Sequence, residues 1–228
     1  MTKPVGTDNA VFWDRRYRDL PALGSGPGSR GYAVFVKRRI VRDVIRRYAP
    51  ATVLDVGCGD MSLVDENLFA GIAYVGVDIS SVIVERNALR FPGYTFVLRD
   101  IAGEPLGLRA DLVLSFDVLI HQLTRAAFDA ALGRILDAID VAGVIGYSTP
   151  PLPDGTAPDY VPDGLAGEEL EHELALQRIL EQTQGVRMGM GTAYYGPFET
   201  LVAAVRPAMR VVPIAVYRDN TAYLVLPG

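Results

Sequence analysis

The stretch VLDVGCGD, residues 53–60, places two carboxylates beside two glycines directly after an apolar run. Gly57 and Gly59 would let a ligand approach the backbone closely, as in a nucleotide-binding turn that follows a buried strand. The dinucleotide pattern G-x-G-x-x-G needs a third glycine, and this sequence has serine there. Asp55 and Asp60 would also repel a pyrophosphate, which binds to bare amides in a positive field. The turn therefore favours a cationic ligand over NAD.

S-adenosylmethionine satisfies these requirements, because it carries a sulfonium and an α-ammonium group and has no phosphate. The acids of the turn would attract its positive groups, and the glycines would let the backbone approach its methionyl part and ribose. Cys58, between the two glycines, would contribute its backbone amide rather than its thiol. The turn therefore favours S-adenosylmethionine over NAD.

Two more acids end the next two apolar runs. Asp78 closes AYVGVD, nineteen residues after Gly59, where a doubly wound fold positions a carboxylate to accept hydrogen bonds from ribose hydroxyls. Asp100 closes YTFVLRD. A carboxylate there could accept a hydrogen bond from the exocyclic amine of adenine while Ile79 and Ile101 pack on the ring faces. Because parallel strands end on one rim of their sheet, the acids at positions 55, 78 and 100 should share one site.

Five short apolar runs, rich in Val, Ile, Leu and aromatic residues, predict the buried strands that carry these turns. They span residues 52–56, 73–78, 94–100, 110–117 and 143–149. Helical periodicity and polar caps predict three helices around them. These span residues 34–48, about 81–90 after a Ser80 cap, and 125–139 after a Thr124 cap. Strands that alternate with helices require right-handed crossovers and hence a doubly wound α/β fold.

The C-terminal segment breaks this alternation. Residues 211–228 contain two strand-like runs joined by RDNT, which predicts a β-hairpin and one antiparallel strand. We therefore expect a mostly parallel, seven-stranded sheet with helices on both faces. The main domain should span residues 34–228 after an N-terminal cap at 1–33, and the irregular stretch 149–197 should form a lid over the substrate.

Taken in order, VLDVGCGD, YVGVD, VLRDI, ADLVLSFDVL and the terminal hairpin resemble the class I S-adenosylmethionine-dependent methyltransferases, over roughly residues 34–228. The resemblance implies a cofactor site with Asp55, Gly57 and Gly59 at the methionyl end, Asp78 at the ribose, and Asp100 with Ile101 at adenine. The sequence departs from the family's fuller D-x-G-x-G-x-G signature, because Met61 replaces the last glycine.

The segment SFDVLIH, residues 115–121, follows the fourth strand and should lie beside the transferred methyl group. Methyl transfer is an in-line displacement, and a hydroxyl acceptor must also lose its proton to a base. On a helical turn, Asp117 and His121 would share one face, as a carboxylate–imidazole base or as half of a metal site. We expect both to be catalytic and Phe116 to contact the cofactor; a surface histidine at a helix start is the alternative.

The N-terminal residues carry a second resemblance. The motif W-x-x-R-Y at residues 13–17, followed by the glycine-rich stretch 24–31, is similar to the leader of small bacterial methyltransferases that act on sugars and secondary metabolites. In those proteins the leader closes over the cofactor. The resemblance implies that Tyr17, Ser29 and Lys37 contact the carboxylate end of the cofactor; a flexible tail is the alternative.

The sequence is less specific about the acceptor and about metals. Tyr194 and Tyr195 could stack on a ring or sugar of the acceptor, or only pack in the core. Magnesium stays open, because Asp154, Asp159 and Asp163 offer oxygen ligands without the spacing of a known metal-binding loop.

Composition limits the setting and the partners. A single cysteine excludes an internal disulfide, no apolar run approaches the ~20 residues of a membrane span, and the N-terminus lacks a secretory signal. These features predict a cytoplasmic protein without a membrane partner. The sequence does not decide whether the protein forms a homodimer. Nucleic acid is not expected, because the basic stretch 37–47 lacks interleaved aromatics and no [D/N/S]-P-P-aromatic motif follows the fourth strand.

These features together predict an O-methyltransferase that uses S-adenosylmethionine. Its acceptor would be a hydroxyl of a small molecule, with a sugar or oligosaccharide of the actinobacterial polysaccharide type favoured. An N- or O-methyltransferase of a secondary metabolite is the first alternative, and a non-catalytic module that binds the cofactor is less favoured. A NAD-dependent oxidoreductase is least favoured, because the charges of the turn oppose a pyrophosphate.

Overall fold

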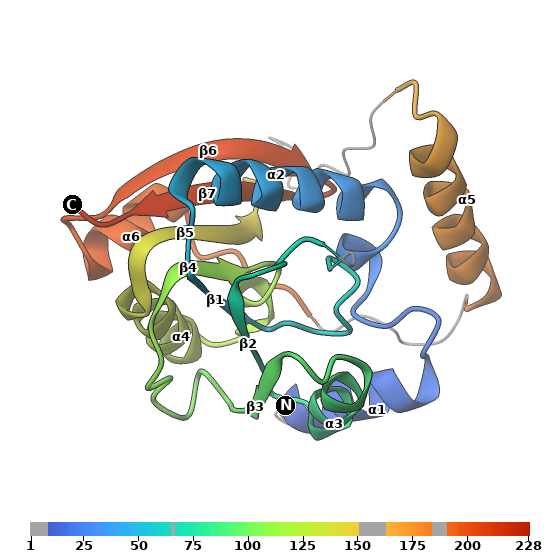
Figure 1. Ribbon diagram of the computed structural model, residues 1–228, viewed down its shortest axis with the longest axis horizontal. Coiled ribbons are helices and arrows are strands. Elements are labelled where there is room, and N and C mark those ends of the chain that lie inside the picture. The colour runs from blue at the N-terminus through green and yellow to red at the C-terminus, as the bar shows by residue number, and fades with distance from the viewer. Residues whose placement is uncertain (1–8, 65–66, 151–162, 184–190) are drawn as a thin grey trace, which may run out of the picture.

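The computed structural model describes residues 9–64, 67–150, 163–183 and 191–228, which fold around one seven-stranded sheet (Figure 1). The strands are β1 (Thr52–Val56), β2 (Ala73–Asp78), β3 (Thr95–Leu98), β4 (Ala110–Ser115), β5 (Ile139–Ser148), β6 (Arg210–Tyr217) and β7 (Asn220–Leu226). Their order is β3-β2-β1-β4-β5-β7-β6. β7 is antiparallel to both of its neighbours, and the other neighbouring pairs are parallel. The predicted α/β fold with a terminal hairpin is confirmed.

Six α-helices and two short 3-10 helices complete the described elements. They are α1 (Asn9–Asp19), α2 (Tyr32–Tyr48), α3 (Ser81–Arg90), α4 (Arg125–Asp137), α5 (Gly167–Gln182), α6 (Phe198–Val205), η1 (Pro27–Ser29) and η2 (Leu119–His121). Both predicted caps are present: the Ser80 side chain accepts a hydrogen bond from Ile83 N, and the Thr124 side chain accepts one from Ala127 N.

Several predicted boundaries differ from the structure by a few residues. The helix expected over 125–139 ends at Asp137, and β5 begins earlier than expected because Ile139 already pairs with Ala110 of β4. The fourth strand ends at Ser115 instead of 117, since Asp117 has a left-handed backbone with φ of +61° that a strand cannot contain. The residues after Ser115 therefore leave the sheet.

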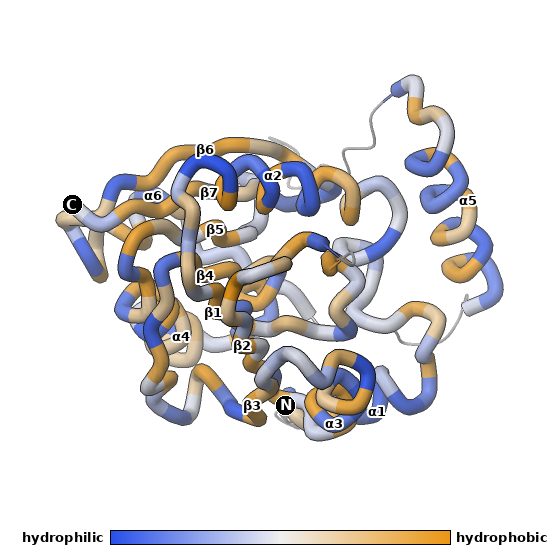
Figure 2. The backbone as a smooth tube through the Cα atoms, in the orientation of Figure 1, coloured by the Kyte–Doolittle hydropathy of each residue, from blue (hydrophilic) through white to orange (hydrophobic). Residues whose placement is uncertain are grey.

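Helices cover both faces of the sheet, as predicted. One hydrophobic core packs the sheet against α4 and α6 through residues such as Phe128, Ile135 and Phe198. A second core packs the opposite face against α2 through Val41 and Val44. Figure 2 shows hydrophobic residues gathered along the strands, whereas the outer side of α2 is largely hydrophilic and hydrophilic and hydrophobic residues alternate along α5. No helix among the described residues is both long and apolar enough to cross a membrane.

The N-terminal residues pack on the body of the fold. α1 lies beside α3 (Figure 1), and the Asp14 carboxylate accepts a hydrogen bond of 2.6 Å from the Ser80 hydroxyl. At the start of α2, the backbone N–H of Tyr32 donates to Glu173 of α5 over 3.2 Å. The Tyr32 hydroxyl accepts a hydrogen bond of 2.7 Å from the backbone N–H of Arg218, which lies 186 residues later in the chain. The start of α2 thus joins distant segments.

The division into a cap, a main domain and a lid stays a prediction. The described part of the lid stretch includes α5, which stands at the edge of the molecule in Figure 1. Residues 1–8, 151–162 and 184–190 lie outside the described residues, and with them Asp154 and Asp159 of the magnesium prediction.

Candidate active site

A pocket lies where β1, β2 and β4 end, between the glycine turn (residues 57–60), η2 and the N-terminal residues. Its walls include every residue predicted to be catalytic or to bind the cofactor. These residues are Tyr17, Ser29, Lys37, Asp55, Gly57, Cys58, Gly59, Asp78, Ile79, Asp100, Ile101, Phe116, Asp117 and His121. The fold therefore brings together fourteen residues that the sequence distributes over about half of its length.

The glycine turn has a backbone that only glycine adopts readily. Gly57 and Gly59 have φ of +78° and +54°. A Cβ on Gly57 would lie 2.1 Å from Val118 Cγ2, and one on Gly59 would lie 2.3 Å from Ser25 Oγ. Met61, at the position of the missing glycine, keeps a positive φ of +59°, a conformation that costs a non-glycine residue about 1 kcal/mol.

Asp78 is buried beside the turn with hydrogen-bonding capacity to spare. Its Oδ2 accepts a hydrogen bond of 2.9 Å from Gly59 N, and its Oδ1 accepts one of 3.0 Å from Ser80 N. Each oxygen keeps a lone pair for another donor, as ribose hydroxyls require. Burial raises the pKa of Asp78 to about 6, so the carboxylate is ionised at neutral pH.

Asp55 is less ionised than the sequence suggests. Its carboxyl accepts a hydrogen bond of 2.8 Å from the Tyr74 hydroxyl. Burial raises the pKa of Asp55 to about 7, and the nearby charge of Asp78 adds to this effect. The raised pKa favours the protonated form, so the group attracts a cation less strongly than a free carboxylate would.

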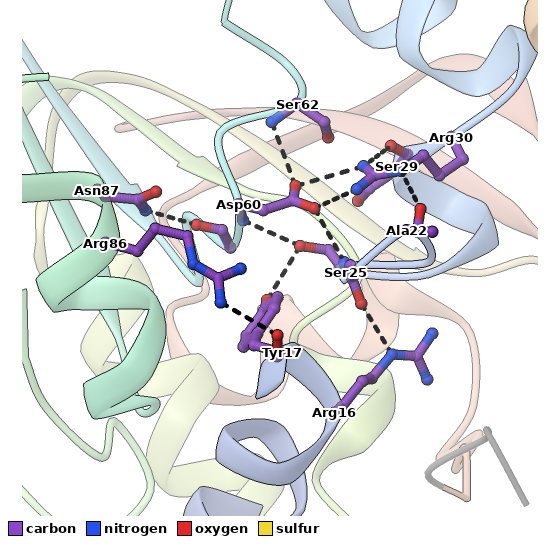
Figure 3. A network of polar contacts seen from close by, with 12 residues as sticks. Arg16, Tyr17, Ala22, Ser25, Ser29, Arg30, Asp60, Ser62, Arg86 and Asn87 are labelled. Atoms are coloured by element: carbon purple, nitrogen blue, oxygen red, sulfur yellow. Dashed lines mark hydrogen bonds and ion pairs between the residues drawn. The ribbon is translucent and has the colours of Figure 1, made fainter. Parts of the chain in front are cut away.

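Asp60 binds the N-terminal residues rather than the pocket. Its carboxylate forms an ion pair with Arg30 and accepts a hydrogen bond of 3.2 Å from Ser25 N, while the Ser25 hydroxyl accepts one of 3.1 Å from Asp60 N (Figure 3). Burial alone would raise the pKa of Asp60, but Arg30 and Ser25 lower it below its usual value. The expectation that Asp60 attracts the ligand is corrected, because its charge is already paired.

The predicted adenine end combines apolar walls with one carboxylate. Ile79 and Ile101 line the pocket together with Asp100, whereas Phe116 lies beside Lys37. Asp100 is half-buried, and its Oδ1 accepts a hydrogen bond of 2.9 Å from Ala102 N. The arrangement can hold a flat ring and bind an amine on its edge.

The expected pair of Asp117 and His121 on one helical turn is absent. Asp117 lies before η2, and its two oxygens accept hydrogen bonds from Lys37 Nζ at 2.7 Å and from the Tyr217 hydroxyl at 2.6 Å. Lys37 is buried, with its ammonium group 5.1 Å from the ring centre of Phe116 and 4.8 Å from that of Tyr217. Lys37, predicted to contact the cofactor's carboxylate end, here neutralises Asp117.

His121 remains in the wall of the pocket without Asp117 as a hydrogen-bond partner. Its Nδ1 lies 3.4 Å from the carbonyl oxygen of Gly191. Burial lowers the pKa of His121, and the hydrogen bond to Gly191 and the charge of Asp117 offset part of this effect. The imidazole is therefore neutral at physiological pH, which is the form a general base requires.

Tyr194 and Tyr195 are not among the residues that line the pocket. Tyr194 stacks on Tyr147, with ring centres 5.9 Å apart. Tyr195 packs on Phe128, and its hydroxyl donates a hydrogen bond of 3.0 Å to the carbonyl oxygen of Gln122. In this structure both rings pack against the protein, and an acceptor contact stays a prediction.

The pocket also contains residues that sequence reasoning missed. Asn9, Trp13 and Ser25 come from the N-terminal residues, and Gln122 follows η2. The sequence contains a signal that could have identified Asn9 and Trp13 as pocket residues. They precede Tyr17 at steps of four residues and so share its face of a helix. Among the described residues, no group of three or more His, Cys, Asp or Glu side chains could hold a metal ion, so the magnesium prediction gains no support.

No protein-family model and no curated protein matches this sequence. Solved structures do match its fold. CalS10, an amino pentose methyltransferase from Micromonospora echinaspora involved in calicheamicin biosynthesis, is 16% identical in its SAM-bound structure, with a TM-score of 0.58 over 100% of both chains. The N-methyltransferase NodS from Bradyrhizobium japonicum WM9, in complex with S-adenosyl-L-homocysteine, is 13% identical, with a TM-score of 0.57 over 94% of this chain and 99% of that chain.

Human N-acetylserotonin methyltransferase in complex with SAM is also similar. It is 18% identical, with a TM-score of 0.59 over 98% of this chain and 61% of that chain. At these identities the similarity concerns the fold. The chain therefore has the fold of the class I S-adenosylmethionine-dependent methyltransferases.

Proposed function

We propose that the protein is an S-adenosylmethionine-dependent methyltransferase that acts on a hydroxyl group of a small molecule. The observation that carries this proposal is the composition of one pocket, with the glycine turn and Asp78 on one side and a neutral His121 on the other. Asp78 suits the ribose of the cofactor, and the apolar wall with Asp100 suits its adenine. When bound, S-adenosylmethionine would supply an electrophilic methyl group and a sulfide leaving group.

His121 is the proposed base. A hydroxyl is a weak nucleophile unless a base removes its proton as the new bond forms. The imidazole of His121 lines the pocket and is neutral, so one ring nitrogen can take that proton directly. Asp117 has a different proposed role, because its carboxylate is bound to Lys37 and Tyr217 and shapes the pocket wall.

The proposed acceptor is a sugar or oligosaccharide. The ion pair of Lys37 and Asp117 adds no net charge to the pocket wall, which suits a neutral acceptor that carries hydroxyls. The similarity of the fold to CalS10, an amino pentose methyltransferase, supports a sugar. An N-methyltransferase is the second candidate, supported by the similarity to NodS. A cationic amine would, however, meet a carboxylate that Lys37 already neutralises.

Titration calorimetry with S-adenosylhomocysteine tests the cofactor. The wild-type protein should bind it and should not bind NAD. Asp78→Asn should weaken the affinity at least tenfold, which corresponds to about 1.4 kcal/mol, because an amide replaces the ribose-binding carboxylate. Asp140→Asn is a matched control, because Asp140 is exposed and pairs with Arg109 away from the pocket. Wild-type protein that does not bind S-adenosylhomocysteine would refute the proposal.

Transfer of a labelled methyl group to a panel of neutral sugars and amino sugars tests the acceptor. With the best substrate, an O-methyltransferase should show a rate that rises with pH through an imidazole-like step, and His121→Gln should remove this step. A rate without such a step, together with a preference for amino sugars, would favour the N-methyltransferase.

A further inference from the structure

One face of α1 forms a wall of the pocket. Asn9, Trp13 and Tyr17 are four residues apart and therefore share this face, and all three line the pocket. The Tyr17 hydroxyl lies 3.0 Å from Ser25 Oγ, near the glycine turn. Asn9 and Trp13 contact the opposite part of the pocket, which contains His121. Neither Asn9 nor Trp13 has a role in the proposed reaction as described above.

Trp13 packs directly on the proposed base. The ring centres of Trp13 and His121 are 5.3 Å apart with an interplanar angle of 68°, which is an edge-to-face arrangement. Asn9 Nδ2 donates a hydrogen bond of 3.4 Å to the backbone oxygen of His121. Trp13 is itself held, because the guanidinium carbon of Arg16 lies 5.5 Å from its ring centre. α1 thus contacts both the side chain and the backbone of His121.

Residues 191–193 contact the segment that contains His121 at two points. The carbonyl oxygen of Gly191 lies 3.4 Å from His121 Nδ1, and the backbone N–H of Ala193 donates a hydrogen bond of 2.8 Å to the carbonyl of Ile120. A carbonyl oxygen only accepts hydrogen bonds, so Nδ1 must carry the proton in this contact. A neutral imidazole has a single N–H, which leaves Nε2 as the basic nitrogen.

We propose that Trp13 is a positioning residue for His121, which together with the Gly191 carbonyl holds the imidazole as its Nδ1–H tautomer and keeps Nε2 as the base of the pocket. This inference rests on the proposed function, in which His121 removes the proton of the acceptor. It goes further by assigning the tautomer and by making α1 part of the catalytic arrangement.

The charges around the ring agree with a neutral base. Burial has the largest effect on the imidazole and lowers its pKa, Asp117 on the same segment raises it, and Arg16 of α1 lowers it. Residues 191–193 are Gly, Thr and Ala and add no charge. The indole of Trp13 carries no charge and covers the ring, so it contributes to the burial that disfavours the imidazolium.

The placement of α1 links the base to the N-terminal residues. The Asp14 carboxylate fixes α1 to the start of α3 through hydrogen bonds from the Ser80 hydroxyl at 2.6 Å and the Ser81 hydroxyl at 3.2 Å. Trp13 precedes Asp14 directly, so docking of α1 on α3 also sets Trp13 against His121. His121 therefore has its contacts with Trp13 and Asn9 only when α1 is docked on α3.

Nitrogen-15 NMR of the histidine rings tests this inference without any acceptor. The chain has two histidines, so a His172→Gln background isolates the signal of His121. The nitrogen shifts should show the proton on Nδ1, and the imidazole should titrate below the usual pKa of about 6.5. Trp13→Leu should give a mixture of tautomers and raise the pKa toward 6.5. Trp13→Phe should preserve most of both properties, because an aromatic ring remains.

Val11→Ala is the matched control, because Val11 lies on α1 with 59% of its surface exposed and is not part of the pocket. It should change neither the tautomer nor the pKa. A wild-type His121 with its proton on Nε2 would overturn the inference, even if Trp13→Leu undocked α1. Unchanged tautomer and pKa in Trp13→Leu would also overturn it. If the wild-type protein did not bind S-adenosylhomocysteine, the proposed function would be refuted, but the tautomer measured for His121 would still hold.

Discussion

Lys37 Nζ lies 2.7 Å from the carboxylate of Asp117, and this ion pair is buried in the wall of the pocket. The side chains of Lys37 and Asp117 expose only 3% and 14% of their surface. η1 covers the pair so closely that a Cβ on Gly28 would lie 2.4 Å from Asp117 Oδ2. One charge pair thus joins α2, the loop after β4 and the N-terminal residues.

Removing one partner of this ion pair should destabilise the fold. Lys37→Met leaves Asp117 buried without a counter-charge, and we expect the free energy of unfolding in urea to fall by about 3 kcal/mol. The double variant Lys37→Met/Asp117→Asn should recover a large part of this loss. Arg15→Met is the control, since it breaks the exposed pair with Asp19 and should cost at most about 0.5 kcal/mol. A loss for Lys37→Met no larger than for this control would contradict the prediction.

The predicted contact between Lys37 and the carboxylate end of the cofactor can be tested separately. The ammonium group has three donors, so it can bind a second carboxylate beside Asp117. Lys37→Met should weaken the affinity for S-adenosylhomocysteine at least tenfold in calorimetry, or about 1.4 kcal/mol. It should leave the affinity for 5′-methylthioadenosine, which lacks the amino-acid part, unchanged. Equal losses for both ligands would show that the variant damages the pocket instead.

Burial of Asp55 should make the protein less stable as the pH rises from about 4 to about 7. Burial raises the pKa of this carboxyl from 3.8 to about 7, so in this range the folded protein binds more protons than the unfolded chain. Stability then falls with increasing pH, by up to about 1.4 kcal/mol for each unit of pKa difference. Asp55→Asn should flatten the pH dependence of the melting temperature and be more stable than wild type at pH 8. Parallel curves for the two proteins would contradict this assignment.

The ion pair between Arg30 and Asp60 should control how often the N-terminal residues leave the glycine turn. Arg30→Gln removes the charge that lowers the pKa of Asp60, and the hydrogen bond from Ser25 N to Asp60 should weaken with it. We expect the amide of Ser25 to exchange with solvent at least tenfold faster, and S-adenosylhomocysteine to dissociate faster in stopped flow. Arg15→Gln, on the exposed side of α1, should change neither rate. Equal exchange of Ser25 in both variants would rule out this role.

The sheet and the rim of the pocket could be predicted because their signals are local. Each apolar run marks a strand, and Asp55, Asp78 and Asp100 stand in or directly after the runs that became β1, β2 and β3. Parallel strands place their ends on one rim whatever the exact length of each strand. The sequence could therefore indicate which side chains meet before the connections between the strands were known.

The charge pairing of the site could not be predicted in the same way. Asp117 is bonded to Lys37, 80 residues earlier, and to Tyr217, 100 residues later, and no periodic pattern reports such contacts. Helical spacing suggested His121 as its partner, but the left-handed backbone of Asp117 separates it from η2. Asp60 was misjudged for a similar reason, because its partner Arg30 lies in an irregular stretch.

The contacts of Tyr32 have a consequence for the order in which the molecule is assembled. Its backbone bonds to Glu173 and its hydroxyl to the backbone of Arg218, 141 and 186 residues later in the chain. During translation, residue 32 leaves the ribosome long before either partner has been synthesised. The bond between Tyr32 and Arg218 therefore cannot form until the hairpin of β6 and β7 has been synthesised, whereas α1 can already dock on α3 through Asp14 and Ser80. The start of α2 thus receives its last tertiary hydrogen bond late in synthesis, although the segments on either side of it can fold earlier.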